Sequence, residues 1–319
     1  MKLQDTLQGA EVAARDRSRP SFFRLARTPF ISASVMPALL GQVLTRVTVG
    51  RINLLAAGLT LGGVAAAHVA ANLLNDLFDF LSGADPCNRR RTPLSGGSPF
   101  LSNHVISPQR VAAYACAAGL VALLCWGTLA WKVDHGWGPL SWIALSGALL
   151  AVFYTAPPVR LAYRSLGEPA IMVTFGPLLV CGAFYAQTGF VSFIPVLASL
   201  YPGLLVGAVI LVNELPDIPA DRAAGKNTLA VRWGYNATVR LLLVVNLAAI
   251  LVVAAMVLHP AITVGVLAGI LGPLVNIAAV ALAAAGEKSS GKLYLAQATT
   301  IAGFNLGMAA MLAGLLLAR

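Results

Sequence analysis

Two short stretches of this 319-residue chain combine carboxylates with asparagines, residue types that can share a divalent cation. In chain order they contain Asn72, Asn75, Asp76, Asp79 and Asp85, and then Asn213, Glu214, Asp217 and Asp221. On a helix Asn72, Asp76 and Asp79 are spaced i, i+4 and i+7, so they would share one face. Mg²⁺ prefers a few carboxylates together with substrate phosphates and retained water. Two such clusters around one cavity therefore predict Mg²⁺ as the cofactor.

The two stretches also form a weak internal repeat. Asn213 follows Asn72 by 141 positions, and Asp217 follows Asp76 by the same interval. In the second stretch Pro216 and Pro219 are expected to break the helix. The alternative interpretation is a pair of solvated helix ends, but solvated acids alone explain neither the asparagines nor the repeat.

Basic residues lie beside both acidic stretches. Arg89, Arg90 and Arg91 follow the first, Arg160 and Arg164 lie between the two, and Arg222, Lys226 and Arg232 follow the second. Carboxylates, Mg²⁺ and Arg or Lys together are suited to gripping a diphosphate. A role in membrane topology alone is the competing interpretation, and it is weakest for Lys226 and Arg232.

These residues need a scaffold, and the composition places that scaffold in a membrane. The chain is 58% hydrophobic and 11% charged, with a mean hydropathy of +0.79. Soluble domains carry about a quarter charged residues, so an ordinary soluble protein is excluded, and so is disorder. We expect an all-α polytopic membrane protein with about nine transmembrane helices of roughly 17–25 residues each. The predicted spans are residues 29–48, 52–75, 110–131, 139–157, 169–188, 192–215, 236–258, 261–284 and 295–317.

The Lys and Arg residues are distributed unevenly over the predicted connections. With a cytoplasmic N-terminus, 18 of the 22 fall on the cytoplasmic side and four on the other. This bias predicts that the N-terminus is cytoplasmic and the C-terminus outside. It also accounts for the net charge of +10 without a nucleic-acid partner. Residues 1–21 are expected to form a cytoplasmic tail, and residues 22–319 a single domain in a prokaryotic cytoplasmic membrane, with no obligate protein partner evident.

Four motifs together resemble those of a known family. They read Asn72-x-x-Asn75-Asp76-x-x-Asp79-x-x-x-Gly83-x-Asp85, Tyr154-Thr-Ala-Pro-Pro-Val-Arg160-Leu-Ala-Tyr163-Arg164, Phe175-Gly176-Pro177, and Asn213-Glu214-x-Pro216-Asp217-x-x-x-Asp221-x-x-x-Gly225-Lys226. The chain resembles the UbiA-type intramembrane aromatic prenyltransferases, most of all their 1,4-dihydroxy-2-naphthoate polyprenyltransferase branch. The resemblance covers about residues 22–319, and it is more specific for the superfamily than for the acceptor.

The resemblance implies nine helices in a ring around a central cavity, with Mg²⁺ bridging both acidic motifs to the diphosphate. The implied catalytic and metal-linked acids are Asp76, Asp79, Asp217 and Asp221. The implied substrate-binding residues are Asn72, Asn75, Arg91, Tyr154, Arg160, Tyr163, Arg164, Asn213, Lys226 and Arg232. Many superfamily members carry D-x-x-x-D in the first motif, whereas here Gly83 takes the last position, which leaves a metal role for Asp85 open.

The expected reaction is transfer of a polyprenyl group from an allylic polyprenyl diphosphate to an aromatic acceptor within the lipid bilayer. The expected acceptor is 1,4-dihydroxy-2-naphthoate, in menaquinone biosynthesis. The alternatives are the same chemistry on 4-hydroxybenzoate, homogentisate or a lipid glycerol, and a membrane transporter. A carrier favours acids near the bilayer midplane, whereas these acids lie at helix ends.

Three further polar residues have weaker assignments, and two of the tyrosines have a second interpretation. His68 lies one turn before Asn72 and is interpreted as an interior histidine with a satisfied hydrogen bond, although it could line the cavity. Glu168 and Gln187 are weaker candidates for contacts with acceptor hydroxyls. For Tyr154 and Tyr163, stacking on the acceptor competes with a place in the interfacial aromatic belt.

Overall fold

The computed structural model describes residues 30–83, 92, 94, 99–103, 105–287 and 289–317. Within these residues every regular element is a helix and there is no strand. The all-α prediction is therefore confirmed. The predicted tail over residues 1–21 and the predicted site residues Asp85 and Arg91 lie outside the described residues.

Helices cover all nine of the predicted ranges. They are α3 (Ser32–Val49), α4 (Leu54–Leu81), α7 (Pro108–Asp134), α8 (Pro139–Phe153), the run α9 (Gly167–Val173), η3 (Thr174–Leu178) and α10 (Leu179–Thr188), α11 (Phe193–Glu214), α14 (Tyr235–Val257), η4 (Val264–Ile270) with α15 (Leu271–Ala284), and α16 (Ser290–Leu317). Seven of these segments are long and apolar enough to cross a membrane. Because α8 has only 15 residues and α3 has 18, the count of nine spans stays a prediction.

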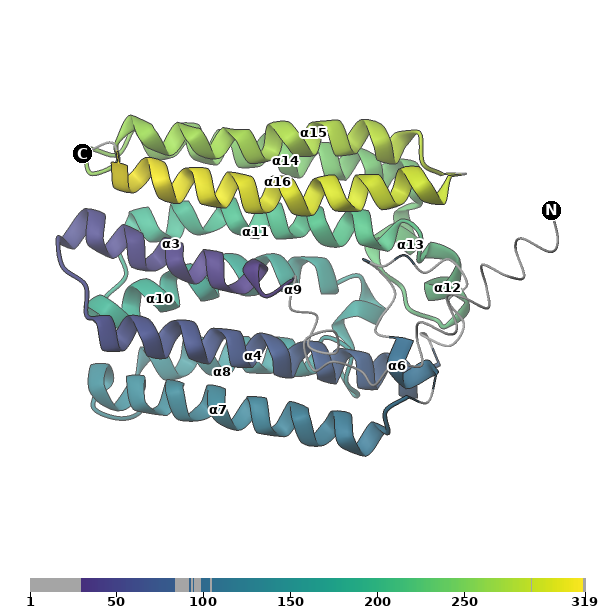
Figure 1. Cartoon of the computed structure of the whole chain (residues 1–319), viewed down its shortest axis with the longest axis horizontal. Helices are drawn as coiled ribbons and strands as arrows, with labels where there is room; N and C mark the ends of the chain where they lie inside the picture. Colours follow the sequence, from purple (N-terminus) through teal and green to yellow (C-terminus); the bar gives the residue numbers. More distant parts are fainter. Residues whose placement is uncertain are drawn as a thin grey trace.

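The long helices lie side by side, and the short elements gather at one end of the bundle (Figure 1). These short elements are α6 (Pro99–Ser102), η2 (Leu161–Arg164), α12 (Ile218–Ala223) and α13 (Leu229–Trp233). Of the Lys and Arg residues that the structure describes, only Arg46, Arg51 and Lys132 belong to the opposite end. The charge asymmetry thus follows the fold, and the assignment of the basic end to the cytoplasm stays a prediction.

Local sequence signals explain where the site-bearing helices begin and end. The Asn53 side chain caps α4 by accepting a hydrogen bond from the Ala56 N–H at 3.1 Å, which satisfies a donor that the first helical turn leaves open. Gly50 turns the chain between α3 and α4 with φ at 84°, a conformation that glycine adopts without strain. From this cap α4 runs unbroken for 28 residues to the acidic motif.

Candidate active site

A single cavity of about 840 Å³ receives side chains from both acidic motifs. It is lined by residues of α3, α4, α7, α8, α9, η3, α10 and α11 and by Lys226. None of its lining residues belongs to α14, α15 or α16. The cavity therefore lies among the first six predicted spans, and the last three pack outside its wall.

The first motif lies on the unbroken helix α4. Asn72, Asn75 and Asp79 line the cavity, as expected for positions three and four residues apart on one helical face. Asp76 is 1% exposed and is not among the lining residues. The structure thus brings three of these four predicted residues to the cavity wall and buries the fourth beside it.

The second motif lies where α11 ends. The helix stops at Glu214, and α12 starts at Ile218 with Asp217 as its N-cap residue. The Asp217 N–H donates to the Glu214 carbonyl at 3.0 Å, and the Asp221 N–H donates to the Asp217 carbonyl at 2.8 Å. The helix break expected at Pro216 is therefore confirmed. Despite it, Asn213, Asp217 and Asp221 line the same cavity as Asp79.

Lys226 joins the two motifs across the cavity. Its Nζ lies 3.4 Å from Asp79 Oδ2 and 4.0 Å from Asp221 Oδ1. Its backbone N–H donates to the Asp221 carbonyl at 2.8 Å, which keeps the side chain beside the second motif. Burial alone would lower the pKa of Lys226, but the carboxylates of Asp79 and Asp221 outweigh burial and raise it well above its usual value. The ammonium therefore stays charged.

For the carboxyl group of Asp221, burial outweighs the attraction of Lys226. Burial raises its pKa to about 7, because the opposing effect of Lys226 is too small to offset burial together with the charges of Asp217 and Asp79. A buried carboxylate with an elevated pKa takes up a proton unless a further cation arrives. The single ammonium group of Lys226 is thus not enough to neutralise the carboxylates at this end of the cavity.

The remaining predicted residues divide into those at the cavity and those outside it. Tyr154 lines the cavity. Arg160 lies over the Tyr163 ring at 5.2 Å, and the Tyr163 hydroxyl donates to Ser82 Oγ at 2.8 Å. This pair ties η2 to the end of α4, and neither member lines the cavity. Arg164 and Arg232 are exposed and do not line it either.

Two buried glutamates lie near the cavity although the sequence predicted only a weak role for Glu168 and none for Glu214. Glu168 is 2% exposed, and its Oε1 accepts a hydrogen bond from the Leu229 N–H at 2.5 Å. Glu214 is 6% exposed and lines the cavity. The two carboxyl groups interact electrostatically. For Glu214 the available signal was its place inside the second motif, between Asn213 and Asp217.

Gln187 does not line the cavity and lies at the end of α4 opposite to the acidic motif, so the structure gives no support to its weak assignment as an acceptor contact. Its Nε2 donates to Gln42 Oε1 at 2.6 Å, and its Oε1 accepts from the Asn53 N–H at 2.8 Å. Asn53 begins α4 at the opposite end from the acidic motif. Gln187 therefore fastens α10 to α3 and α4 there.

The donor atoms at the acidic end match a hard divalent cation. One buried side-chain oxygen each of Asn75, Asp79, Asn213 and Glu214 has no hydrogen-bond partner. Among the described residues no three His, Cys, Asp or Glu side chains are close enough together to enclose a metal ion. Mg²⁺ needs no such cage, since it takes one or two carboxylates plus phosphate and water oxygens. The residues present therefore fit Mg²⁺ shared with a phosphate ligand.

Comparison with known proteins agrees with this arrangement. The model of the UbiA prenyltransferase family matches residues 34–301. The 1,4-dihydroxy-2-naphthoate octaprenyltransferase of Bacillus subtilis (strain 168) is 29% identical over 235 residues, which is 74% of this chain and 73% of that protein. UbiA prenyltransferase domain-containing protein 1 of Xenopus tropicalis is 30% identical over 215 residues, 66% of this chain and 59% of the relative.

Solved structures share the fold. A UbiA homolog from Archaeoglobus fulgidus bound to DMAPP and Mg²⁺ has a TM-score of 0.59 at 15% identity, covering 92% of this chain and 99% of that one. A UbiA homolog from Aeropyrum pernix K1 has a TM-score of 0.63 at 20% identity, covering 88% and 97%. The helical architecture found here is therefore that of known membrane proteins.

Proposed function

Because the chain belongs to the UbiA prenyltransferase family and is a polyprenyltransferase, we propose that it prenylates 1,4-dihydroxy-2-naphthoate with an allylic polyprenyl diphosphate. The reaction is Mg²⁺-dependent and belongs to menaquinone biosynthesis, and the active site opens to the cytoplasm. One observation carries the proposal: a single cavity joins both acidic motifs and Lys226 to a long apolar volume. The naphthoate acceptor is favoured by the activity named for the Bacillus subtilis relative.

The polar end is suited to the diphosphate of the donor. Asp76, Asp79, Asp217 and Asp221 would hold Mg²⁺, which when bound supplies charge neutralisation for the leaving diphosphate. The Lys226 ammonium, already placed between the two motifs, donates hydrogen bonds to phosphate oxygens. The amides of Asn72, Asn75 and Asn213 line the same end and offer both donors and acceptors.

The apolar part of the cavity is suited to the prenyl chain and the reacting carbon. When the C1–O bond of the donor breaks, its electron pair leaves with the diphosphate, and C1 becomes the end of an allylic cation. The ring carbon that bears the carboxylate then gives an electron pair to C1. The bond from that carbon to the carboxylate breaks, its electron pair returns to the ring, and CO₂ leaves. Water would capture the cation, so side chains such as Leu150, Ile171 and Phe175 that line the cavity keep water out.

Other acceptors remain the second candidate, because relatives with other names share the family. One solved structure of the same fold is described as digeranylgeranylglyceryl phosphate synthase, with a TM-score of 0.63. The test is purified protein in lipid nanodiscs with Mg²⁺, a labelled polyprenyl diphosphate and a panel of acceptors. The panel contains 1,4-dihydroxy-2-naphthoate, 4-hydroxybenzoate, homogentisate and a glycerol lipid. Transfer to another acceptor without transfer to the naphthoate overturns the acceptor assignment.

The same assay tests the acidic motifs. Asp76→Asn and Asp79→Asn should each abolish transfer while leaving the protein folded, because each removes a charge assigned to the cation. Glu287→Gln is the matched control, since Glu287 is an exposed acid beyond the end of α15. Undiminished transfer by both aspartate variants overturns the metal assignment.

A further inference from the structure

His68 is a polar side chain of the cavity wall that the proposed chemistry has not used. It lies on α4, is 8% exposed and lines the cavity together with Asn72 and Asp79. At 1.5 Å of rise per residue, His68 lies about 6 Å below Asn72 and about 16 Å below Asp79 along the helix axis. A diphosphate and a fused aromatic ring placed end to end span a distance of this order.

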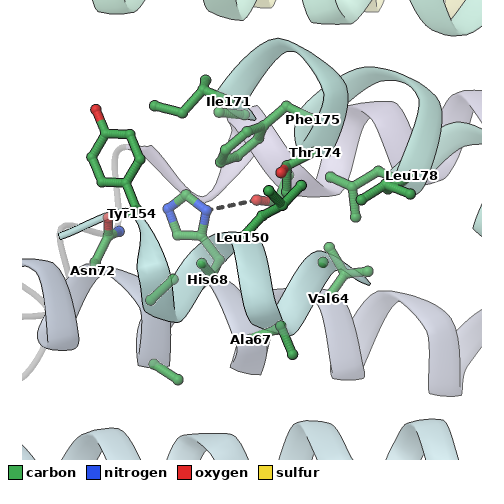
Figure 2. Close-up of a pocket in the computed structure, with 18 of the residues that line it drawn as sticks. Val64, Ala67, His68, Asn72, Leu150, Tyr154, Ile171, Thr174, Phe175 and Leu178 are labelled. Carbon is green, nitrogen blue, oxygen red and sulfur yellow. Dashed lines mark hydrogen bonds between the residues drawn. The ribbon is translucent and has the colours of Figure 1, made fainter. Parts of the chain in front are cut away.

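A hydrogen bond from a neighbouring helix holds the imidazole in place. Ser34 Oγ on α3 lies 2.6 Å from His68 Nδ1. A hydroxyl can donate or accept, so Ser34 can hold either neutral tautomer of the ring. Figure 2 shows the second ring nitrogen on the side of Asn72 and Tyr154, away from the dashed hydrogen bond. The ring is therefore oriented with one nitrogen toward α3 and the other toward the polar end of the cavity.

The surroundings of His68 are aromatic and aliphatic. The Phe175 ring meets the imidazole edge to face, with centroids 6.0 Å apart and planes at 85°. Val64, Leu150 and Ile171 complete the wall in the same view (Figure 2). Aromatic rings favour such edge-to-face and offset arrangements with one another. The cavity wall around His68 therefore presents aromatic edges and one oriented nitrogen to a flat ligand.

The prenyl chain of the donor and the aromatic acceptor differ in whether they can hydrogen-bond the second ring nitrogen of His68. A prenyl chain has no polar atom, so it gains nothing from an imidazole in its path, and a buried polar group that loses its hydrogen bonds is costly. A hydroxylated aromatic ring carries a donor on a flat apolar body and fits both features.

We infer that His68, held by Ser34, hydrogen-bonds a ring hydroxyl of the aromatic acceptor and so fixes which ring carbon faces the prenyl donor. This inference rests on the proposed function and adds a residue that recognises the acceptor. It separates the two substrates along α4: the acids and Lys226 recognise the donor, and His68 recognises the acceptor one to three helical turns away.

The test measures acceptor and donor kinetics separately for His68→Leu, His68→Gln and Ser34→Ala in nanodiscs with Mg²⁺. His68→Leu should lower kcat/KM for the dihydroxynaphthoate roughly tenfold, the value of about one hydrogen bond, and leave the KM for the donor within about twofold. His68→Gln keeps a hydrogen-bonding amide and should recover most of the loss. His259→Leu, at the end opposite to the acids, is the matched control.

A substrate–variant cycle separates recognition from a structural role. The analogues 1-hydroxy-2-naphthoate and 4-hydroxy-2-naphthoate each lack one hydroxyl of the acceptor, and each is titrated as a competitor of the dihydroxynaphthoate. One of them should bind wild type and His68→Leu equally, because it lacks the group that His68 contacts. The inference is overturned if His68→Leu loses the same affinity for both analogues, or if the KM values for donor and acceptor change in parallel. Either result leaves the proposed prenyl transfer itself standing. Wild-type protein that prenylates only a glycerol lipid overturns the proposed function as well.

Discussion

Lys226 allows the sharpest test of the site, because its removal has opposite consequences for folding and for cation binding. Replacing it by methionine keeps the length of the side chain and removes the charge. With an effective dielectric constant of about 20, the distances of 3.4 and 4.0 Å to Asp79 and Asp221 correspond to attractions of about 5 and about 4 kcal/mol. Desolvation of the ammonium offsets part of this, so a net loss of about 3–5 kcal/mol is expected.

The loss should depend on pH because Asp221 titrates. Its pKa of about 7 means that well below pH 7 the carboxyl group is already neutral and attracts Lys226 little. Thermal unfolding of purified Lys226→Met without Mg²⁺ should therefore show a large deficit at pH 8.5 and a smaller one at pH 5.5. Mg²⁺ should then stabilise the variant more than wild type, because it no longer competes with an ammonium for the same oxygens.

Arg232→Met is the matched control, since Arg232 is a nearby exposed cation on α13. It should lose little stability at either pH, as exposed charges contribute little. A Lys226→Met protein as stable as wild type at pH 8.5 would refute the electrostatic argument. A deficit of the same size at both pH values would refute the role of Asp221 in it.

Three further predictions follow from the same contacts. First, the raised pKa of Asp221 means that the folded chain binds a proton that the unfolded chain releases near pH 4, so Mg²⁺-free stability should fall as pH rises from about 4 to about 7. Thermal unfolding of Asp221→Asn should flatten this slope. Second, Gly307→Ala should destabilise the protein by about 1–3 kcal/mol, since an added methyl group meets the Gly272 Cα and the Tyr201 hydroxyl. Gly58→Ala, with nothing within 4 Å, should be neutral or slightly stabilising in the same denaturation experiment. Third, Tyr163→Phe should lose about 1 kcal/mol of stability with the bond to Ser82, and the KM of the donor should not change.

The fold was predictable because its signals are local. Long apolar runs predicted the membrane helices, and Pro216 predicted the end of α11 within two residues of Glu214. The bending of that stretch back toward α4 was not predictable from the local pattern. Lys226 meets Asp79 across 147 positions of sequence, and no periodicity encodes such a contact. The pairing of the two motifs around one cavity was predicted from their matching residue types and their 141-residue repeat, and the resemblance to the family agreed with it.

The lining of the cavity shows where helical periodicity reaches its limit. At about 100° per residue, Asp76 lies roughly 40° to one side of Asn72, and Asn75 lies roughly 60° to the other. Sequence spacing alone favoured Asp76 over Asn75. In the structure Asn75 lines the cavity and Asp76 does not. His68 lies on the same side of Asn72 as Asn75, so which side faces the cavity is decided by the helices packed opposite α4.

Lys226 and Arg232 show the same limit for charged residues. Both follow the second motif, and both were predicted to contact substrate. Lys226 is turned inward because its own backbone N–H is bonded to the Asp221 carbonyl. Arg232 is carried on the exposed side of the short helix α13. Composition could identify a basic loop, but the direction of each side chain depends on backbone contacts that the composition does not contain.

The charge balance of the cavity favours binding of the proposed diphosphate donor together with a cation. Among the described lining residues, Asp79, Glu214, Asp217 and Asp221 face a single ammonium, that of Lys226. Even with one carboxyl group protonated, carboxylates outnumber the ammonium, so a free diphosphate would meet a like charge in a place with little water to screen it. A diphosphate that arrives with Mg²⁺ reverses this, because the same oxygens then become ligands. The acids that repel the bare anion would therefore favour its Mg²⁺ complex under the proposed function. The asparagines beside them are neutral and would oppose neither form.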